Sequence, residues 1–192
     1  EPHSGYGELV IDVGQPGIKM SDQLYGLFFE DINHGADGGL YAEMVRNRSF
    51  EFNSADGAGM NGLTAWRAVQ RGGGVATLKI SQQEPLNKHN LHYVRVNIVE
   101  SGTGVGLMNT GFNSGFNIEA GASYDLSFYA RRSGSFTEPV VITLESVTGT
   151  VYGQVELMVT SSEWQKYTAT ITAEGTSTGA RLVLTTIGSG SI

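Results

Sequence analysis

The stretch that decides the fold is Tyr124–Arg131, YDLSFYAR, in which apolar and polar side chains alternate along the chain. The even positions carry aromatic or apolar residues, and the odd positions carry Asp125, Ser127, Tyr129 and Arg131. Successive side chains of a β-strand point to opposite faces of its sheet. The stretch therefore predicts a strand with one face in a core and a polar outer face that presents the ring of Tyr129.

The same pattern continues on both sides of this stretch. In Val140–Ser146, Ile142 and Leu144 are expected in the core, while Thr143 and Glu145 are expected on the outer surface. Further strands, bounded by turn residues, are predicted at residues 66–69, 75–81, 92–99, 105–108, 115–119, 154–159, 165–172 and 180–187. Regularly spaced strands without helices between them are typical of an antiparallel β-sandwich, here a jelly roll.

Composition excludes several functional classes. The net charge of −7 and the absence of a basic cluster argue against nucleic acid and membrane surfaces as partners. The chain has no cysteine, which excludes disulfides, zinc–thiolate sites and a cysteine nucleophile. No apolar run approaches the length of a membrane span.

A different unit precedes the sandwich. Leu24–Phe29 is a short apolar run typical of a strand, and Glu30, Asn33 and His34 follow it directly. The apolar residues that then recur at helical spacing are Leu40, Met44 and Val45. Strand, polar loop and short helix are the opening unit of a β/α barrel or of a wound sheet, and in both folds the loop after a strand carries the binding groups.

Three ordered blocks in this unit, Gly26–His34, Asp37–Glu43 and Asn47–Phe52, resemble the N-terminal signature of glycoside hydrolase family 51. Those enzymes are mostly retaining α-L-arabinofuranosidases. The resemblance implies the N-terminal portion of a secreted enzyme that removes terminal arabinofuranosyl groups from plant cell-wall arabinoxylan and arabinan. It also implies the remainder of that parent enzyme as a partner of this chain.

The resemblance assigns substrate binding to Glu30, which would accept hydrogen bonds from arabinofuranose hydroxyls, with Asn33 and His34 assisting. By spacing alone, the sequence favours a solvated acid at a strand end for Glu30 and a structural group beside a turn for His34. Retaining glycosidases need two carboxyl groups about 5–5.5 Å apart. Neighbouring Glu30 and Asp31 point to opposite faces of an extended strand, so they cannot form that pair.

No catalytic residue is therefore expected in this chain. By the resemblance, the acid/base is a glutamate directly after an asparagine and the nucleophile is a later glutamate. The sequence contains no Asn–Glu dipeptide. The chain then lacks both catalytic carboxylates, although its parent would be a glycosidase.

From Asn47 onward the sequence resembles carbohydrate-binding modules of families 4 and 9, on the blocks Asn47–Glu51 and Gly121–Arg131. This resemblance implies sugar stacking by Trp66 and Tyr129, because aromatic rings stack on the C–H faces of sugars. It also implies a structural Ca²⁺ with Glu51 as a ligand, since Ca²⁺ takes oxygen ligands. No other cofactor is expected.

Several alternatives stay open at this point. Tyr152 and Trp164 are further stacking candidates, although Trp164 lies where such modules bury a core tryptophan, and Trp66 fits a core position equally well. Asn47-Arg48-Ser49 matches the N-glycosylation pattern, which occurs often by chance. A free-standing carbohydrate-binding module and a purely structural sandwich are the competing interpretations of the chain.

The expected organisation has three parts. Residues 1–20 form an accessory strand segment, residues 21–46 form the first β/α unit of the catalytic barrel, and residues 47–192 form the sandwich, which lacks its last strand. The unpaired edge and an exposed apolar helix face are then expected to favour association of the isolated chain.

Overall fold

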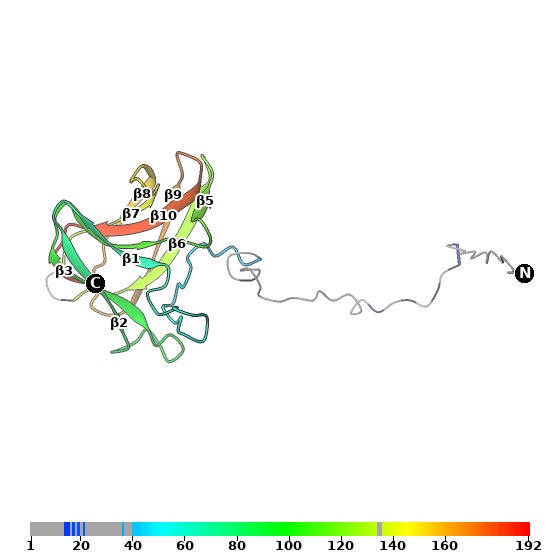
Figure 1. Cartoon of the computed structure of the whole chain (residues 1–192), viewed down its shortest axis with the longest axis horizontal. Coiled ribbons are helices and arrows are strands. Elements are labelled where there is room, and N and C mark those ends of the chain that lie inside the picture. Colours follow the sequence, from blue (N-terminus) through cyan, green and yellow to red (C-terminus); the bar gives the residue numbers. More distant parts are fainter. Residues whose placement is uncertain are drawn as a thin grey trace, which may run out of the picture. The chain divides into compact units, whose positions relative to one another are not determined.

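The computed structural model describes residues 40–133 and 136–192, together with residues 14, 15, 17, 19, 21 and 36 (Figure 1). The strand expected before Glu30, and the side chains of Glu30, Asn33 and His34, lie outside the described residues. In the part that is described, every regular element is a β-strand. No helix long and apolar enough to cross a membrane occurs among these residues.

The larger sheet consists of antiparallel strands in the order β1-β4-β10-β7-β8. Its strands are β1 (Trp66–Arg71), β4 (Gly104–Asn109), β10 (Ser177–Thr186), β7 (Val140–Glu145) and β8 (Val151–Leu157). A short strand, β5 (Phe116–Ile118), also pairs with β10. Strand β10 is thus a central strand, with β4 on one side and β7 on the other.

The remaining strands form two smaller sheets. One has the order β11-β3-β2, with β11 (Gly190–Ser191), β3 (Tyr93–Glu100) and β2 (Val75–Ser81). The other pairs β6 (Ser123–Ala130) with β9 (Gln165–Thr172). All of these pairs are antiparallel. One hydrophobic cluster contains side chains from the larger sheet and from both smaller ones, which is the arrangement of a β-sandwich.

Alternation along the strands matches the prediction where a sheet has one solvated face. On β6, Leu126 and Phe128 pack against the core, whereas Asp125 and Ser127 are exposed. The predicted ranges 75–81 and 165–172 coincide with β2 and β9, and the other predicted strands differ from the observed ones by a few residues at their ends. The expected antiparallel sandwich is therefore confirmed.

Strand β7 departs from the expected pattern, because both of its faces are buried. Thr143 and Glu145, predicted on the outer surface, are 4% and 3% exposed. Glu145 accepts a hydrogen bond of 2.5 Å from the Thr143 hydroxyl, and its carboxylate lies 2.6 Å from the Arg71 guanidinium. A buried carboxylate needs such partners, and the polar pattern alone does not reveal that they exist.

The helix predicted from Leu40, Met44 and Val45 is absent from the described residues 40–46. Met44 and Val45 pack instead against the core of the sandwich. The main chain of Arg46 accepts a hydrogen bond from the Asn109 side-chain amide at 2.9 Å and donates one to its oxygen at 3.2 Å. Asn109 thus satisfies the backbone of Arg46. The Glu43 carboxylate accepts a hydrogen bond of 2.7 Å from the Val45 backbone, so these groups are paired without a helix.

The end of the chain forms a strand that the sequence did not predict. Gly190 and Ser191 of β11 pair with Ile98 and Asn97 of β3. Ile192 extends this pairing by exchanging backbone hydrogen bonds of 2.8 and 3.1 Å with Val96. These residues lie on one edge of β3.

Candidate binding groove

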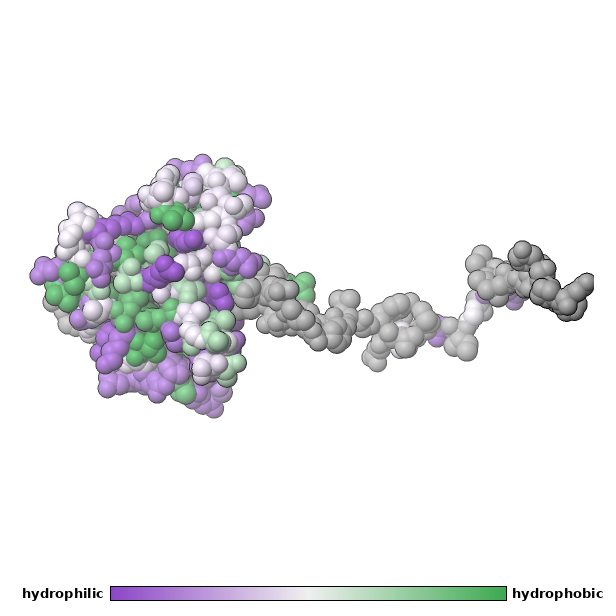
Figure 2. Space-filling view, in the orientation of Figure 1, coloured by the Kyte–Doolittle hydropathy of each residue, from purple (hydrophilic) through white to green (hydrophobic). Residues whose placement is uncertain are grey.

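An open groove of about 1000 Å³ lies between β3 and β6. Its floor is formed by inward-facing aliphatic side chains of the larger sheet: Val105, Leu107, Val140, Leu182 and Leu184. Figure 2 shows hydrophobic surface gathered in the middle of the side of the sandwich that is in view, with hydrophilic residues around it. The groove therefore has an apolar floor and a polar surround.

A cluster of aromatic and charged side chains spans this groove. The Arg131 guanidinium lies 5.5 Å from the ring centre of Tyr93 and 5.0 Å from that of Trp164. The two rings meet edge to face at 5.0 Å. Arg131 also forms an ion pair of 2.8 Å with Glu84, whose backbone oxygen accepts a 2.9 Å hydrogen bond from the Trp164 indole. These contacts tie β3 and the loop before it to the residues directly after β6 and directly before β9.

Electrostatics reinforce the cluster. Burial lowers the pKa of Arg131, but the Tyr93 hydroxyl and the Glu84 carboxylate outweigh it, so the pKa lies above its usual value. Burial raises the pKa of Tyr93, but hydrogen bonds with Ser81, Arg131 and Arg95 outweigh it and bring the pKa below its usual value. Arg131 therefore stays charged at every ordinary pH.

Asn47 anchors the chain as it enters the sandwich. Its side chain is almost fully buried, and its amide donates to the backbone oxygens of Gly62 at 3.0 Å and Thr64 at 3.1 Å. Its backbone φ of 55° is a left-handed conformation that asparagine adopts more readily than most residues. The Trp66 indole donates to the Asn47 backbone oxygen at 2.9 Å. In this folded state the amide of the glycosylation pattern is buried and engaged.

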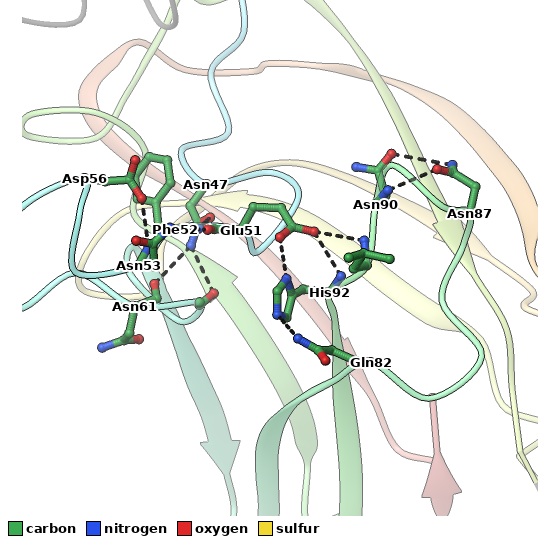
Figure 3. Close-up of polar contacts among 12 residues, drawn as sticks. Asn47, Glu51, Phe52, Asn53, Asp56, Asn61, Gln82, Asn87, Asn90 and His92 are labelled. Atoms are coloured by element: carbon green, nitrogen blue, oxygen red, sulfur yellow. Dashed lines mark hydrogen bonds and ion pairs between the residues drawn. The ribbon is translucent and has the colours of Figure 1, made fainter.

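Glu51 is held by the segment that leads into β3 (Figure 3). Its carboxylate accepts backbone hydrogen bonds of 3.0 Å from Leu91 and His92, and it also contacts His92 Nδ1. The Gln82 amide lies 2.5 Å from His92 Nε2. Burial raises the pKa of Glu51, but the hydrogen bonds and charge of His92 and the backbone of Leu91 outweigh it, so the pKa lies below its usual value.

The surroundings of Glu51 bear on the expected calcium site. Among the described residues, no group of three or more His, Cys, Asp or Glu side chains could hold a metal ion. A calcium ion at Glu51 would have to share its carboxylate with Leu91 and His92, and would need further ligands from backbone or amide oxygens. The calcium site stays a prediction.

The aromatic candidates fall into different environments. Trp66 is partly buried, with its ring centre 5.0 Å from that of Phe50, and Tyr152 packs against the core. Trp164 is partly buried in the Arg131 cluster and is not a core residue, contrary to the expected core position. Tyr129 is 50% exposed on the outer face of β6, so its ring is accessible to a ligand. The sequence analysis missed Tyr93, because its partners lie far away in the chain.

Comparison with known proteins decides the family. The family model described as "Carbohydrate binding domain" matches residues 42–189. This chain belongs to that family. The carbohydrate-binding domain so defined includes strands β1 to β10, together with Glu51, Trp66 and Tyr129.

Similarity to named proteins extends over most of the chain. An extracellular exo-α-L-arabinofuranosidase of Streptomyces chartreusis is 36% identical over 176 residues, which cover 92% of this chain and 20% of the relative. Alpha-L-arabinofuranosidase 1 of Arabidopsis thaliana is 32% identical over 184 residues, which cover 92% of this chain and 26% of the relative. The chain thus spans about a fifth to a quarter of the length of these relatives.

A solved structure agrees with these sequence matches. An arabinose-bound GH51 α-L-arabinofuranosidase superposes with a TM-score of 0.72 at 29% identity, covering 87% of this chain and 27% of that chain. The chain therefore has a structural relative within a larger arabinofuranosidase.

Proposed function

We propose that this chain is the N-terminal portion of a secreted, retaining α-L-arabinofuranosidase that removes arabinofuranosyl groups from arabinoxylan and arabinan. One observation carries the proposal: the match to the Streptomyces relative covers 92% of the chain, more than the domain at residues 42–189. The similarity therefore includes residues outside the carbohydrate-binding domain. Secretion is supported by the extracellular character of that relative.

Within this proposal, the chain supplies substrate contacts and the catalytic carboxylates lie elsewhere in the full-length protein. Residues 21–46 would be the first β/α unit of the barrel, with Glu30 accepting hydrogen bonds from the arabinofuranose and Asn33 and His34 beside it. The absence of an Asn–Glu dipeptide from the sequence agrees with this division.

The carbohydrate-binding domain would hold the enzyme on its polysaccharide. Tyr129 is the ring best placed for stacking, because it is half exposed on the outer face of β6. Trp66 offers less of its ring, since Phe50 packs against it. Polar side chains beside Tyr129 on the β6–β9 surface, such as Ser127 and Thr168, could bond sugar hydroxyls.

The test compares the full-length protein with the 192-residue chain on aryl α-L-arabinofuranosides and on arabinoxylan. The full-length protein should release arabinose, and the chain alone should not. In the full-length protein, Glu30→Ala should lower kcat/KM about 10- to 100-fold, because a charge-assisted hydrogen bond contributes roughly 1.5–3 kcal/mol. Glu8→Ala, another acid near the N-terminus, serves as the control. Unchanged kcat/KM in Glu30→Ala would refute the role of Glu30, and turnover by the chain alone would refute the division of labour.

A further inference from the structure

The groove between β3 and β6 exposes side chains that face the core. The inward-facing apolar residues that remain only partly buried around it are Val94, Leu107, Leu126, Phe128 and Leu184. Leu182, which precedes Leu184 by two residues on the same face of β10, is 5% exposed. Since the two layers of a sandwich bury each other's inner faces, the layer opposite Leu184 is incomplete.

The groove is one strand wide where β11 enters it. Ser191 pairs with Asn97 of β3 on one side and forms an antiparallel bridge with Ser133, just after β6, on the other. The Ser133 backbone donates to the Ser191 oxygen at 3.0 Å. Because neighbouring strands lie about 4.8 Å apart, a single strand bridges β3 and the end of β6 at this level.

Beyond β11, both sides of the groove are open strand edges. Alternate residues of an antiparallel strand direct their N–H and C=O groups to the same neighbour. The backbone N–H and C=O of Val96 both form hydrogen bonds with Ile192, so they point toward β11. Val94, two residues earlier on β3, therefore directs its N–H and C=O toward the same side, into the groove. By the same alternation from Ser133, the backbones of Tyr129 and Ser127 face it from β6. Among the residues described, no strand pairs with these edges of β3 and β6 beyond β11.

We propose that an extended β-strand binds in this groove, formed by the polypeptide that continues from Ile192 in the full-length protein. Strand β11 runs antiparallel to β3 and points along the open part of the groove. A strand continuing in this direction would pair with both edges and join the smaller sheets in the order β2-β3-β11-β6-β9. This inference rests on the proposed function, in which the chain is the N-terminal portion of a longer protein; the greater length of the relatives, of which the chain covers 20% and 26%, supports that premise.

The chemistry of the groove favours a peptide strand over a saccharide. Two backbone edges offer alternating donors and acceptors at strand spacing, which is the basis of strand addition. The floor is aliphatic, with Leu107 and Leu184 exposed to the groove. Sugar sites instead combine aromatic faces with convergent polar groups, and the rings of Tyr93 and Trp164 already contact Arg131.

The register of β11 predicts the pattern of the incoming segment. Ile192 packs against the core, and it pairs with Val96. The second, fourth and sixth residues after Ile192 would therefore face the core and should be apolar. The first would lie opposite Arg131, which directly follows β6, and the third opposite Tyr129 of β6, with side chains on the outer surface.

The test is amide hydrogen exchange by NMR on two proteins: the 192-residue chain, and the same chain extended by about eight of its own following residues, enough to match β6 at about 3.3 Å per residue. Extension should slow exchange at Val94, Ser127 and Tyr129 on the order of 100-fold, since exposed edge amides join a cooperative sheet. The amides of Leu78 and Thr168, on the outer edges of β2 and β9, are internal controls and should not change.

Two variants of the extended chain sharpen this test. Ile192→Asp places a charge on the core-facing side of β11 and should abolish the added protection. Ser189→Asp, at an exposed neighbouring position, should preserve it. If the extended chain is insoluble, the same following residues, added as a separate peptide, must protect the same amides.

Three results would overturn the proposal. Unchanged exchange at Val94 and Tyr129 on extension would show that the groove takes no strand from this segment. Protection that disappears on dilution would show that a second copy supplies the strand. Protection of these amides in the unextended chain by arabinoxylan oligosaccharides would assign the groove to a saccharide. None of these results depends on whether the full-length protein hydrolyses arabinofuranosides.

Discussion

The larger sheet and the two smaller sheets differ in how completely they bury strands of the same sequence pattern. Strands β4, β10 and β7 have partners on both edges, and the middle of their sheet is buried on both faces, including Thr143 and Glu145. Strands β3 and β6 show equally regular alternation, yet each has an edge open to the groove. Alternation thus predicts a strand, while its neighbours decide how far the strand is buried.

The largest expected effect on stability comes from truncating a leucine in the closed core, compared with a leucine that lines the groove. Leu182→Ala should lower the free energy of unfolding by about 2–5 kcal/mol, because it leaves a cavity in a closed part of the core. Leu184→Ala, the matched truncation on the same face of β10, should cost less than about 2 kcal/mol, because water already reaches this side chain. Urea unfolding of both variants measures the difference, and equal losses would mean that the groove is closed in solution.

The next effect concerns the buried carboxylate of the larger sheet. Glu145 is 3% exposed, whereas the side chain of its partner Arg71 is 42% exposed. Arg71→Met leaves the buried Glu145 carboxylate without its cationic partner and should lower the free energy of unfolding by about 1–3 kcal/mol. Glu145→Gln should cost less, because the freed guanidinium can turn to water.

Chemical denaturation of these two variants, with the exposed Glu156→Gln as a control, checks the order of the effects. A larger loss in Glu145→Gln than in Arg71→Met would show that the guanidinium, and not the carboxylate, is the buried partner.

A smaller effect should depend on pH. The pKa of Glu51 is lower in the folded chain than its ordinary value. Its stabilising contribution is therefore fully present above the ordinary value of about 4.3 and is lost as the pH falls through the lower folded pKa. The difference in Tm between the unmodified chain and Glu51→Gln should shrink as the pH is lowered from about 6 to 3.

The same pair of proteins tests the calcium prediction. If Glu51 binds Ca²⁺, added Ca²⁺ should raise the Tm of the unmodified chain and leave that of Glu51→Gln unchanged, since ligands stabilise the state that binds them. An unchanged Tm of the unmodified chain in the presence of Ca²⁺ would show that Glu51 is not a calcium ligand.

The smallest effect on stability is expected on the outer face of β6. Tyr129→Ala should change the free energy of unfolding by less than about 0.5 kcal/mol, because its ring is half exposed. It should nevertheless weaken arabinoxylan binding in affinity electrophoresis, if the ring stacks on sugar. Ser123→Ala, exposed at the other end of the same face of β6, is the control, and equal binding by both variants would contradict the stacking role.

Particular residues show how far the sequence could predict this site. The strict alternation of Tyr124–Arg131 was sufficient to predict β6 and the exposed ring of Tyr129. The recurrence of Leu40, Met44 and Val45 suggested a helix, but hydrogen bonds from Asn109 and packing against the core hold that segment without one. Trp164 could not be placed from its own neighbours, because Tyr93, Glu84 and Arg131 approach it from distant parts of the chain.

The sequence by itself determined the antiparallel strands, their inward faces and the family, because side-chain periodicity and local motifs are properties of consecutive residues. Only the tertiary structure decided that Glu145 is buried beside Arg71, that Asn47 is engaged by distant backbone oxygens, and that a groove one strand wide separates β3 from β6. The physical reason is that burial and edge pairing depend on which strands become neighbours. Which strands become neighbours depends on packing across the whole sandwich, and the side-chain periodicity of a single strand does not reveal it.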